Sequence, residues 1–169
     1  MAIDADTYKQ GMRQLAAAVT IVTTEHEGQR CGLTATAVCS LSADPPTLLV
    51  CVNRSAAAHD RIKLGRRFCV NVLSDEDAAL SRRFAGLEKG EARFTAGVWR
   101  TAVTGAPVLD HALASFDCEL IEQVEAGTHT IFIGRVHAVE TRPGRRPLLY
   151  SDGDYSGLAA LEDVVTGRA

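Results

Sequence analysis

The order of apolar and polar residues along the chain predicts one short helix followed by a series of strands. Within residues 5–17, apolar side chains recur at the three- and four-residue spacing of one helix face. The pattern then changes to runs rich in β-branched and apolar residues, separated by turn-forming sequences such as HEGQR and ADPP. We therefore predict strands at 19–25, 31–42, 47–53 and 68–73.

Helical spacing returns in two short segments, and the second half is again strand-like. Residues 55–65 and 75–86 each begin with a residue that can cap a helix and end near a glycine. Further strands are predicted at 98–103, 114–126, 129–142 and 147–155, and Gly127 between the two long runs indicates a hairpin. This pattern favours a mainly β protein with short helices, an antiparallel barrel or sandwich, in a single domain over residues 1–169.

Composition narrows the class of protein. The chain has 169 residues, of which 46% are hydrophobic and 23% charged, with a formal net charge of -3. These values are typical of a soluble globular protein, and they give no indication of nucleic-acid binding. The N-terminus has no signal-peptide pattern, and no apolar run reaches the roughly 20 residues of a membrane helix, so we expect no membrane association and a cytoplasmic location.

Several kinds of chemistry lose support from the motifs. The five cysteines contain no CxxC pair, and Cys39, Cys51 and Cys69 have apolar neighbours, which predicts buried thiols rather than disulfides. The histidines are widely spaced, so we expect no metal site. There is no phosphate-loop, G-x-S-x-G or H-E-x-x-H motif, which disfavours the corresponding nucleotide-hydrolysing, esterase-like and zinc-peptidase chemistries.

One stretch, CGLTATAVCSLSADPPTLLVCVNRS at 31–55, has too little bulk for a core strand. Its hydroxyl and small side chains suit either a strand with one solvated face or a cradle for a planar ligand with many acceptors, and the residues alone leave these two readings balanced. The residues concerned are Thr34, Ala35, Thr36, Ala37, Ser40 and Ser42. Asn53, Arg54 and Ser55 then end a strand at a helix start, where the alternatives are an anion site and a plain cap.

Two further polar side chains stand at positions that could face a cleft. His129 lies where a hairpin turn enters a strongly apolar strand, and Tyr155 follows Gly153 near the C-terminus. For each of them, ordinary surface exposure is the simpler alternative.

Taken in order, these stretches resemble the short-chain flavin reductase family, whose members have an FMN-binding split-barrel fold. The resemblance covers nearly the whole chain, and its most telling elements are GLTATAVCSLSADPPTLLVCVN, FCVNVL, RRFAG and THTIFIGRV. It implies a homodimer that uses NADH or NADPH to reduce FMN or FAD, and it implies that the reduced flavin passes to a separate monooxygenase.

The resemblance also assigns residues to a site. It implies that Thr34, Ala35, Thr36 and Ala37 lie along the flavin ring with Ser40 and Ser42 nearby, and that Asn53, Arg54 and Ser55 hold the ribityl and phosphate end. It also implies that Arg83, Phe84 and Ala85 form another flavin contact. It further implies that His129 is the catalytic-site histidine close to the nicotinamide and that Tyr155 closes over the site. The chain departs from the family pattern at Thr128, where aspartate is common, and at Ala56, Ala57 and Ala58, where hydroxyls are common.

The implied chemistry is transfer of a hydride from the nicotinamide C4 to the flavin N5, for which the protein supplies alignment rather than a nucleophile. Two alternatives belong to other classes. One is a flavin- or haem-binding module of similar shape without NAD(P)H turnover, and the other is a partner protein that only carries reduced flavin.

Overall fold

The computed structural model describes residues 3–159. Its helical segments are α1 Ala5–Arg13, α2 Ala57–Gly65, η1 Asp75–Asp77, α3 Ala78–Arg82, η2 Arg83–Leu87 and η3 Gly90–Thr95. Its strands are β1 Ala17–Ala18, β2 Thr20–His26, β3 Gln29–Ala35, β4 Val38–Ala43, β5 Pro46–Asn53, β6 Arg67–Val72, β7 Trp99–Thr101, β8 Pro107–Leu109, β9 Ala114–Ala126, β10 His129–Thr141, β11 Leu148–Ser151 and β12 Asp154–Gly157.

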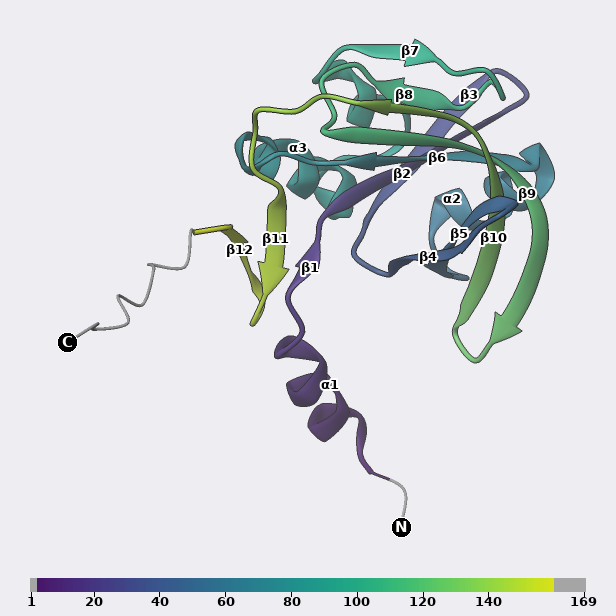
Figure 1. The fold of residues 1–169 in the computed structure, drawn as a ribbon. Coiled ribbons are helices and arrows are strands. Elements are labelled where there is room, and N and C mark those ends of the chain that lie inside the picture. Colours follow the sequence, from purple (N-terminus) through teal and green to yellow (C-terminus); the bar gives the residue numbers. More distant parts are fainter. Residues whose placement is uncertain (1–2, 160–169) are drawn as a thin grey trace.

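A seven-stranded antiparallel sheet forms the body of the molecule, in the order β3-β2-β6-β9-β10-β5-β4 (Figure 1). Its two edge strands, β3 and β4, are consecutive in the sequence and are joined by Thr36 and Ala37 alone. The sheet must therefore curl until its edges nearly meet, which gives a barrel that is split at this junction. The prediction of a mainly β, antiparallel split barrel with short helices is confirmed.

The long hairpin of β9 and β10 is also confirmed, and it turns at Gly127, whose φ of 57° favours glycine. Two smaller sheets, β1-β11-β12 and β7-β8, flank the main sheet. Helix α1 projects from the body in Figure 1 and has no buried residue. No helix within residues 3–159 is long and apolar enough to cross a membrane.

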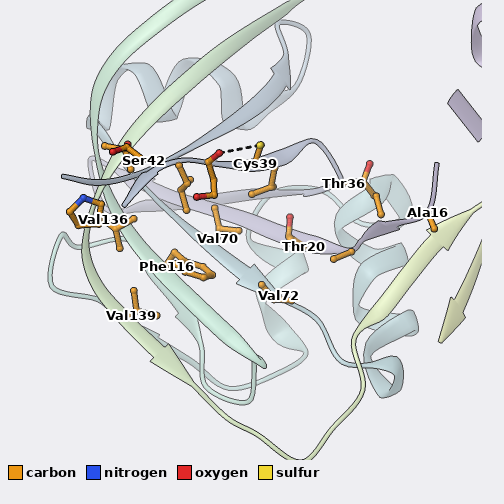
Figure 2. A pocket seen from close by; sticks show the side chains of 17 residues that line it. Ala16, Thr20, Thr36, Cys39, Ser42, Val70, Val72, Phe116, Val136 and Val139 are labelled. Carbon is orange, nitrogen blue, oxygen red and sulfur yellow. Dashed lines mark hydrogen bonds between the residues drawn. The ribbon is translucent and has the colours of Figure 1, made fainter. Parts of the chain in front are cut away.

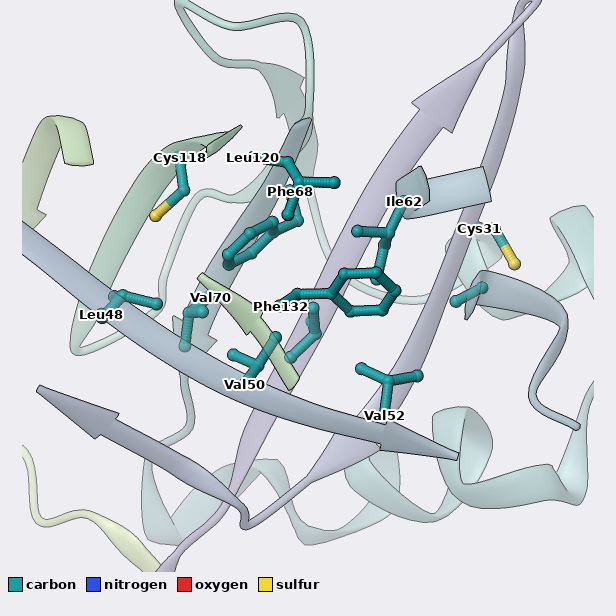
Figure 3. Close-up of a cluster of buried hydrophobic side chains, with 12 residues drawn as sticks. Cys31, Leu48, Val50, Val52, Ile62, Phe68, Val70, Cys118, Leu120 and Phe132 are labelled. Carbon is teal, nitrogen blue, oxygen red and sulfur yellow. The ribbon is translucent and has the colours of Figure 1, made fainter. Parts of the chain in front are cut away.

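The inside of the curled sheet holds the largest of the three apolar clusters found among residues 3–159, shown in Figure 3. Phe68 from β6 and Phe132 from β10 are completely buried there, and Ile62 covers them from α2. A second cluster lies under α3 and η2 and includes Phe84 and Phe94. Because complete burial of each such side chain contributes about 1.5–3 kcal/mol, these clusters fix the positions of the strands that surround the junction.

The structure corrects four boundaries predicted from the sequence. The strand predicted at 31–42 is interrupted at Thr36 and Ala37, because the chain passes there from one edge of the sheet to the other. The helix predicted at 75–86 consists of three different helical turns, ending around Gly86 with a φ of 129°. The segment 98–103 forms only the short strand β7, and 147–155 folds back on itself as the hairpin of β11 and β12.

The cysteines follow the sequence prediction in part. Cys69 is buried and burial raises the pKa of its thiol well above the usual value; burial likewise raises the pKa of Cys118, to about 12. The prediction of burial is wrong for Cys39, which is exposed because β4 is an edge strand, whereas Cys51 is half-buried. The five cysteines are free thiols in the structure.

Candidate functional site

The junction between β3 and β4 forms an exposed ledge of backbone and small side chains. The Val38 amide donates to the Thr36 carbonyl at 3.0 Å, which makes a sharp corner, and the Cys51 amide donates to the Ala37 carbonyl at 3.0 Å. Both Thr36 and Ala37 are exposed. A planar group could therefore approach the backbone closely at this corner, as the sequence TATA suggested.

The end of β5 lies beside this corner, because the residue whose amide donates to the Ala37 carbonyl, Cys51, is only two positions before Asn53 in the sequence. The Asn53 Oδ1 atom accepts from both the amide and the hydroxyl of Ser55 at 2.9 Å, which forms a turn into α2. Ala56 is the N-cap of α2 and supplies no side-chain hydrogen bond to it. The first amide groups of the helix therefore lack a side-chain partner, a condition that suits an anion.

His129 stands next to this turn. In the pairing of β10 with β5, His129 is directly opposite Asn53, and the Arg54 amide donates to the Thr128 carbonyl at 2.9 Å. The imidazole is exposed, and its Nδ1 atom lies 2.9 Å from the Thr128 hydroxyl. Thr128, which stands where the pattern of the resembled family commonly has aspartate, can thus still fix the orientation of the imidazole ring.

Two other predicted residues, Thr34 on β3 and Tyr155 on β12, are linked by hydrogen bonds through Ser81. The Thr34 hydroxyl donates to the Ser81 carbonyl at 2.6 Å, and the Ser81 hydroxyl lies 2.7 Å from the Tyr155 hydroxyl. The sequence analysis did not identify Ser81 as a site residue. Its position directly before RRFAG is the one feature that could have indicated this role. Thr34 and Tyr155, far apart in the chain, are joined through this one residue.

The segment RRFAG carries two cations, of which Arg82 lies over the Tyr155 ring, 5.1 Å from its centroid. Arg83 donates to the Ala92 carbonyl at 3.0 Å and to the Thr95 hydroxyl at 3.1 Å, and Ala85 is exposed. The Phe84 ring is 1% exposed and packs in the second apolar cluster, so any contact of this residue with a ligand would come from its backbone.

A cavity of about 570 Å³ adjoins the corner at Thr36 and is lined by residues of β4, β5, β6, β9 and β10 (Figure 2). Its walls are mainly apolar and include Val70, Val72 and Phe116, while Thr36, Ser40 and Ser42 contribute hydroxyls. Thr36 is therefore shared between the ledge and the cavity. The remaining predicted site residues lie outside this cavity, on the two sides of the ledge described above.

A chain of polar groups that begins at the surface with Asp60 and ends at the buried Thr130 supports the segment that carries His129. The Nε2 atom of His59 lies 2.8 Å from the Thr130 hydroxyl, and its Nδ1 atom lies 2.7 Å from the carboxylate of Asp60. His59 and Thr130 are 7% and 2% exposed, so the imidazole and the hydroxyl are closed to a substrate, although the Asp60 carboxylate is at the surface. This chain of polar groups instead fastens α2 to the start of β10.

Replacing Thr130 with valine, which has nearly the same shape, should leave the buried Nε2 atom of His59 without its hydrogen-bond partner. We expect the free energy of unfolding to fall by about 1–3 kcal/mol, because a buried polar atom loses its hydrogen bond. Urea denaturation measures this loss. Thr130→Ser keeps the hydroxyl and is the matched control, and equal stability of the valine and wild-type proteins would contradict the role of this bond.

The fold and the ledge define a class: a split-barrel protein in which an exposed ledge of small residues lies beside a helix start that has no side-chain cap. The family model described as "Flavin reductase like domain" matches residues 12–159, and the chain belongs to this family. A relative from Ancylobacter novellus, the FMN reductase (NADH) RutF, is 44% identical over 162 residues, which cover 96% of this chain and 90% of the relative.

Solved structures of the same family superpose closely. Flavin reductase PheA2 in its native state gives a TM-score of 0.86 at 34% identity, covering 94% of this chain and 100% of that chain. BorF, the flavin reductase component of a bacterial two-component tryptophan halogenase, gives a TM-score of 0.86 at 32% identity, covering 94% of this chain and 100% of the BorF chain.

Proposed function

We propose that the protein is an NADH-dependent flavin reductase that reduces FMN and releases it for use by a separate oxygenase. The observation that carries this proposal is the convergence of the ledge at Thr36 and Ala37 with the turn at Asn53 and with His129. The family match and the names of the relatives support the same activity. FAD and NADPH are the alternative flavin and hydride donor.

The residues at the ledge fit a flavin. The backbone of 34–37 leaves room for the ring, and Arg54 together with the first amides of α2 can hold the phosphate. The Arg54 guanidinium is 3.8 Å from Glu125, a loose exposed pair that leaves it available to an anion. The ribityl hydroxyls would then lie near Asn53 and Ser55, and Tyr155 would approach the ring from the side of Ser81.

The bound flavin supplies the atom that accepts a hydride from the nicotinamide. The chain itself contributes alignment: His129 would orient the carboxamide of the nicotinamide, and the ledge would hold the flavin ring so that one face stays open to the donor. This assignment needs no acid or base among the described residues.

We propose in addition that the reduced flavin is consumed by a monooxygenase or a related oxygenase in the cytoplasm. The name of the structural relative BorF, the reductase component of a two-component halogenase, supports a division of labour of this kind. Mixing the protein with NADH, FMN and a candidate oxygenase would test the transfer by formation of the oxygenated product.

We also propose that the protein is a homodimer. Val50, Val52 and Phe132 point into the core, so their neighbours along β5 and β10 point outward. Three outward apolar side chains, Cys51, Ile131 and Val124, lie in one row across β5, β10 and β9. Such a stripe is suited to a second copy of the chain.

Light scattering after size exclusion would test the dimer. We expect a dimer mass for the wild type and for Val103→Lys, a control at a residue that is 81% exposed on another surface. Ile131→Lys should give a monomer, because it places a charge in the middle of the stripe. A wild-type monomer would contradict the proposal.

The activity is tested by following the absorbance of NADH with and without added FMN. Flavin-dependent oxidation of NADH supports the reductase, whereas flavin binding without oxidation would favour a binding module. The variant Ala37→Leu should raise the KM for FMN by about tenfold or more, since the larger side chain occupies the ledge. Ala92→Leu, at another exposed alanine, is the control.

A further inference from the structure

Glu125 lies beside the helix start that is proposed to hold the flavin phosphate. Its carboxylate is 3.8 Å from the Arg54 guanidinium, and the two side chains are 61% and 52% exposed. Among residues 3–159, this is the only ion pair that either side chain makes. Arg54 therefore already has one partner, and the charge of that partner has the same sign as the charge of a phosphate.

The strand pairing fixes the face of the sheet on which the Glu125 carboxylate lies. Glu125 is paired with Thr130 of β10, and residues directly opposite each other on neighbouring antiparallel strands have their side chains on the same face. The Thr130 hydroxyl lies 2.8 Å from the imidazole of His59, which belongs to α2. Glu125 is therefore on the face that α2 covers, whereas its neighbour Val124 is on the opposite face.

The backbone holds the end of the β9–β10 hairpin against the segment that leads into α2. The Arg54 amide donates to the Thr128 carbonyl at 2.9 Å, directly after the turn at Gly127. Because this bond joins the two segments, the Glu125 carboxylate can move away from the helix start only as far as its own side chain reaches. It therefore stays near the proposed phosphate site.

Few side chains at the start of α2 can share the work of Arg54. The helix begins with alanines at 56–58, which supply no hydroxyl, and its first turn contains the carboxylate of Asp60. Within residues 53–60, Arg54 is the only arginine or lysine. Because side-chain recognition of the phosphate depends mainly on Arg54, a group that competes for this guanidinium weakens the whole contact.

We propose that Glu125 is a specificity-determining residue of the flavin site, because its carboxylate competes with the flavin phosphate for Arg54 and so keeps FMN exchangeable. The inference rests on the proposed function. A phosphate monoester carries a charge of about −1.5 to −2 at pH 7, so it can displace Glu125 from Arg54, but it then lies next to the displaced carboxylate. Riboflavin, which has the same ring and no phosphate, experiences neither the competition nor the repulsion. A weak hold on the phosphate suits a reductase that releases its product to an oxygenase.

The test compares FMN with riboflavin in the variant Glu125→Gln, which removes the charge and keeps the size of the side chain. Titration of flavin fluorescence should show a Kd for FMN that is about fivefold lower than in the wild type, with the Kd for riboflavin unchanged. The dissociation rate of FMN, measured by stopped flow, should fall by a similar factor. The control is Glu122→Gln, which removes the same charge from the opposite face of β9, where Glu122 is paired with Ile133. It should match the wild type with both flavins.

A double-mutant cycle shows whether Glu125 acts through Arg54. Arg54→Gln should raise the Kd for FMN about tenfold, because the phosphate loses its one side-chain cation. Glu125→Gln added to Arg54→Gln should then change the Kd for FMN by about twofold or less, since only the repulsion between carboxylate and phosphate remains to be removed. An undiminished effect in the double variant would overturn the competition for Arg54.

The failure of this inference differs from the failure of the proposed function. An unchanged or raised Kd for FMN in Glu125→Gln, an equal change for riboflavin, or the same change in Glu122→Gln would overturn the role of Glu125. An unchanged Kd for FMN in Arg54→Gln would overturn the placement of the phosphate as well. Absence of FMN-dependent oxidation of NADH by the wild type would overturn the proposed activity itself, whatever the flavin titrations show.

Discussion

Replacing His129 with alanine is expected to lower kcat/KM for NADH by about 100-fold, because a misaligned nicotinamide loses the near-attack geometry that hydride transfer requires. The affinity for FMN should stay within about twofold, since the proposed partner of His129 is the donor and the proposed partners of the flavin phosphate are Arg54 and the first amides of α2. Steady-state kinetics with varied NADH, together with a flavin-binding titration, measure the two quantities separately.

His137→Ala is the matched control, because His137 lies on the same strand and pairs with Glu119 at 3.0 Å, away from the ledge. Thr128→Val separates a further contribution, since it removes the hydroxyl that lies 2.9 Å from the imidazole. If His129→Ala kept the wild-type KM and turnover, the role of this residue in donor alignment would be wrong.

Replacing Gly134 with alanine is expected to destabilise the protein by about 3 kcal/mol, because the core around β10 has no space for one more carbon. A Cβ atom at this position would lie 2.5 Å from a ring carbon of Phe68 and 2.8 Å from the Cβ of Cys118. Both neighbours are completely buried, so neither can move without disturbing the first apolar cluster.

Thermal or urea denaturation measures this effect, and Gly11→Ala is the control. Gly11 lies within α1 and nothing within 4 Å would meet its added Cβ, so alanine there should be neutral or stabilising through its higher helix propensity. A loss below about 0.5 kcal/mol for Gly134→Ala would show that Phe68 relaxes more readily than the packing suggests.

The parts of the fold that depend on local patterns were predictable from the sequence. Alternating apolar residues and the turn at Gly127 identified the hairpin of β9 and β10, and turn-forming residues bounded β2 and β5. The corner at Thr36 and Ala37 was not predictable in this way, because it arises from the distant edges of the sheet and not from any helix-breaking or turn-forming residue nearby.

The site shows the same division. The hydroxyls and small residues of TATA left a solvated strand and a ligand surface equally supported, and only the resemblance favoured the ligand surface and assigned His129 to the same site. The resemblance could not give side-chain directions: it implies a flavin contact at Phe84, whose ring packs against Phe94 and Trp99, which leaves the backbone for such a contact. The link from Thr34 through Ser81 to Tyr155 depends on tertiary packing that leaves no periodic trace in the sequence.

The junction of β3 and β4 also has a consequence for how the protein responds to its ligand. These strands are the two ends of the sheet, and the ladder of hydrogen bonds is not continued across them. A flavin lying on Thr36 and Ala37 would contact both edge strands of the sheet, β3 and β4. Binding would therefore add a connection between them where the hydrogen bonds of the sheet are interrupted. Occupancy would then stiffen the whole sheet, and each release of reduced flavin would loosen it again.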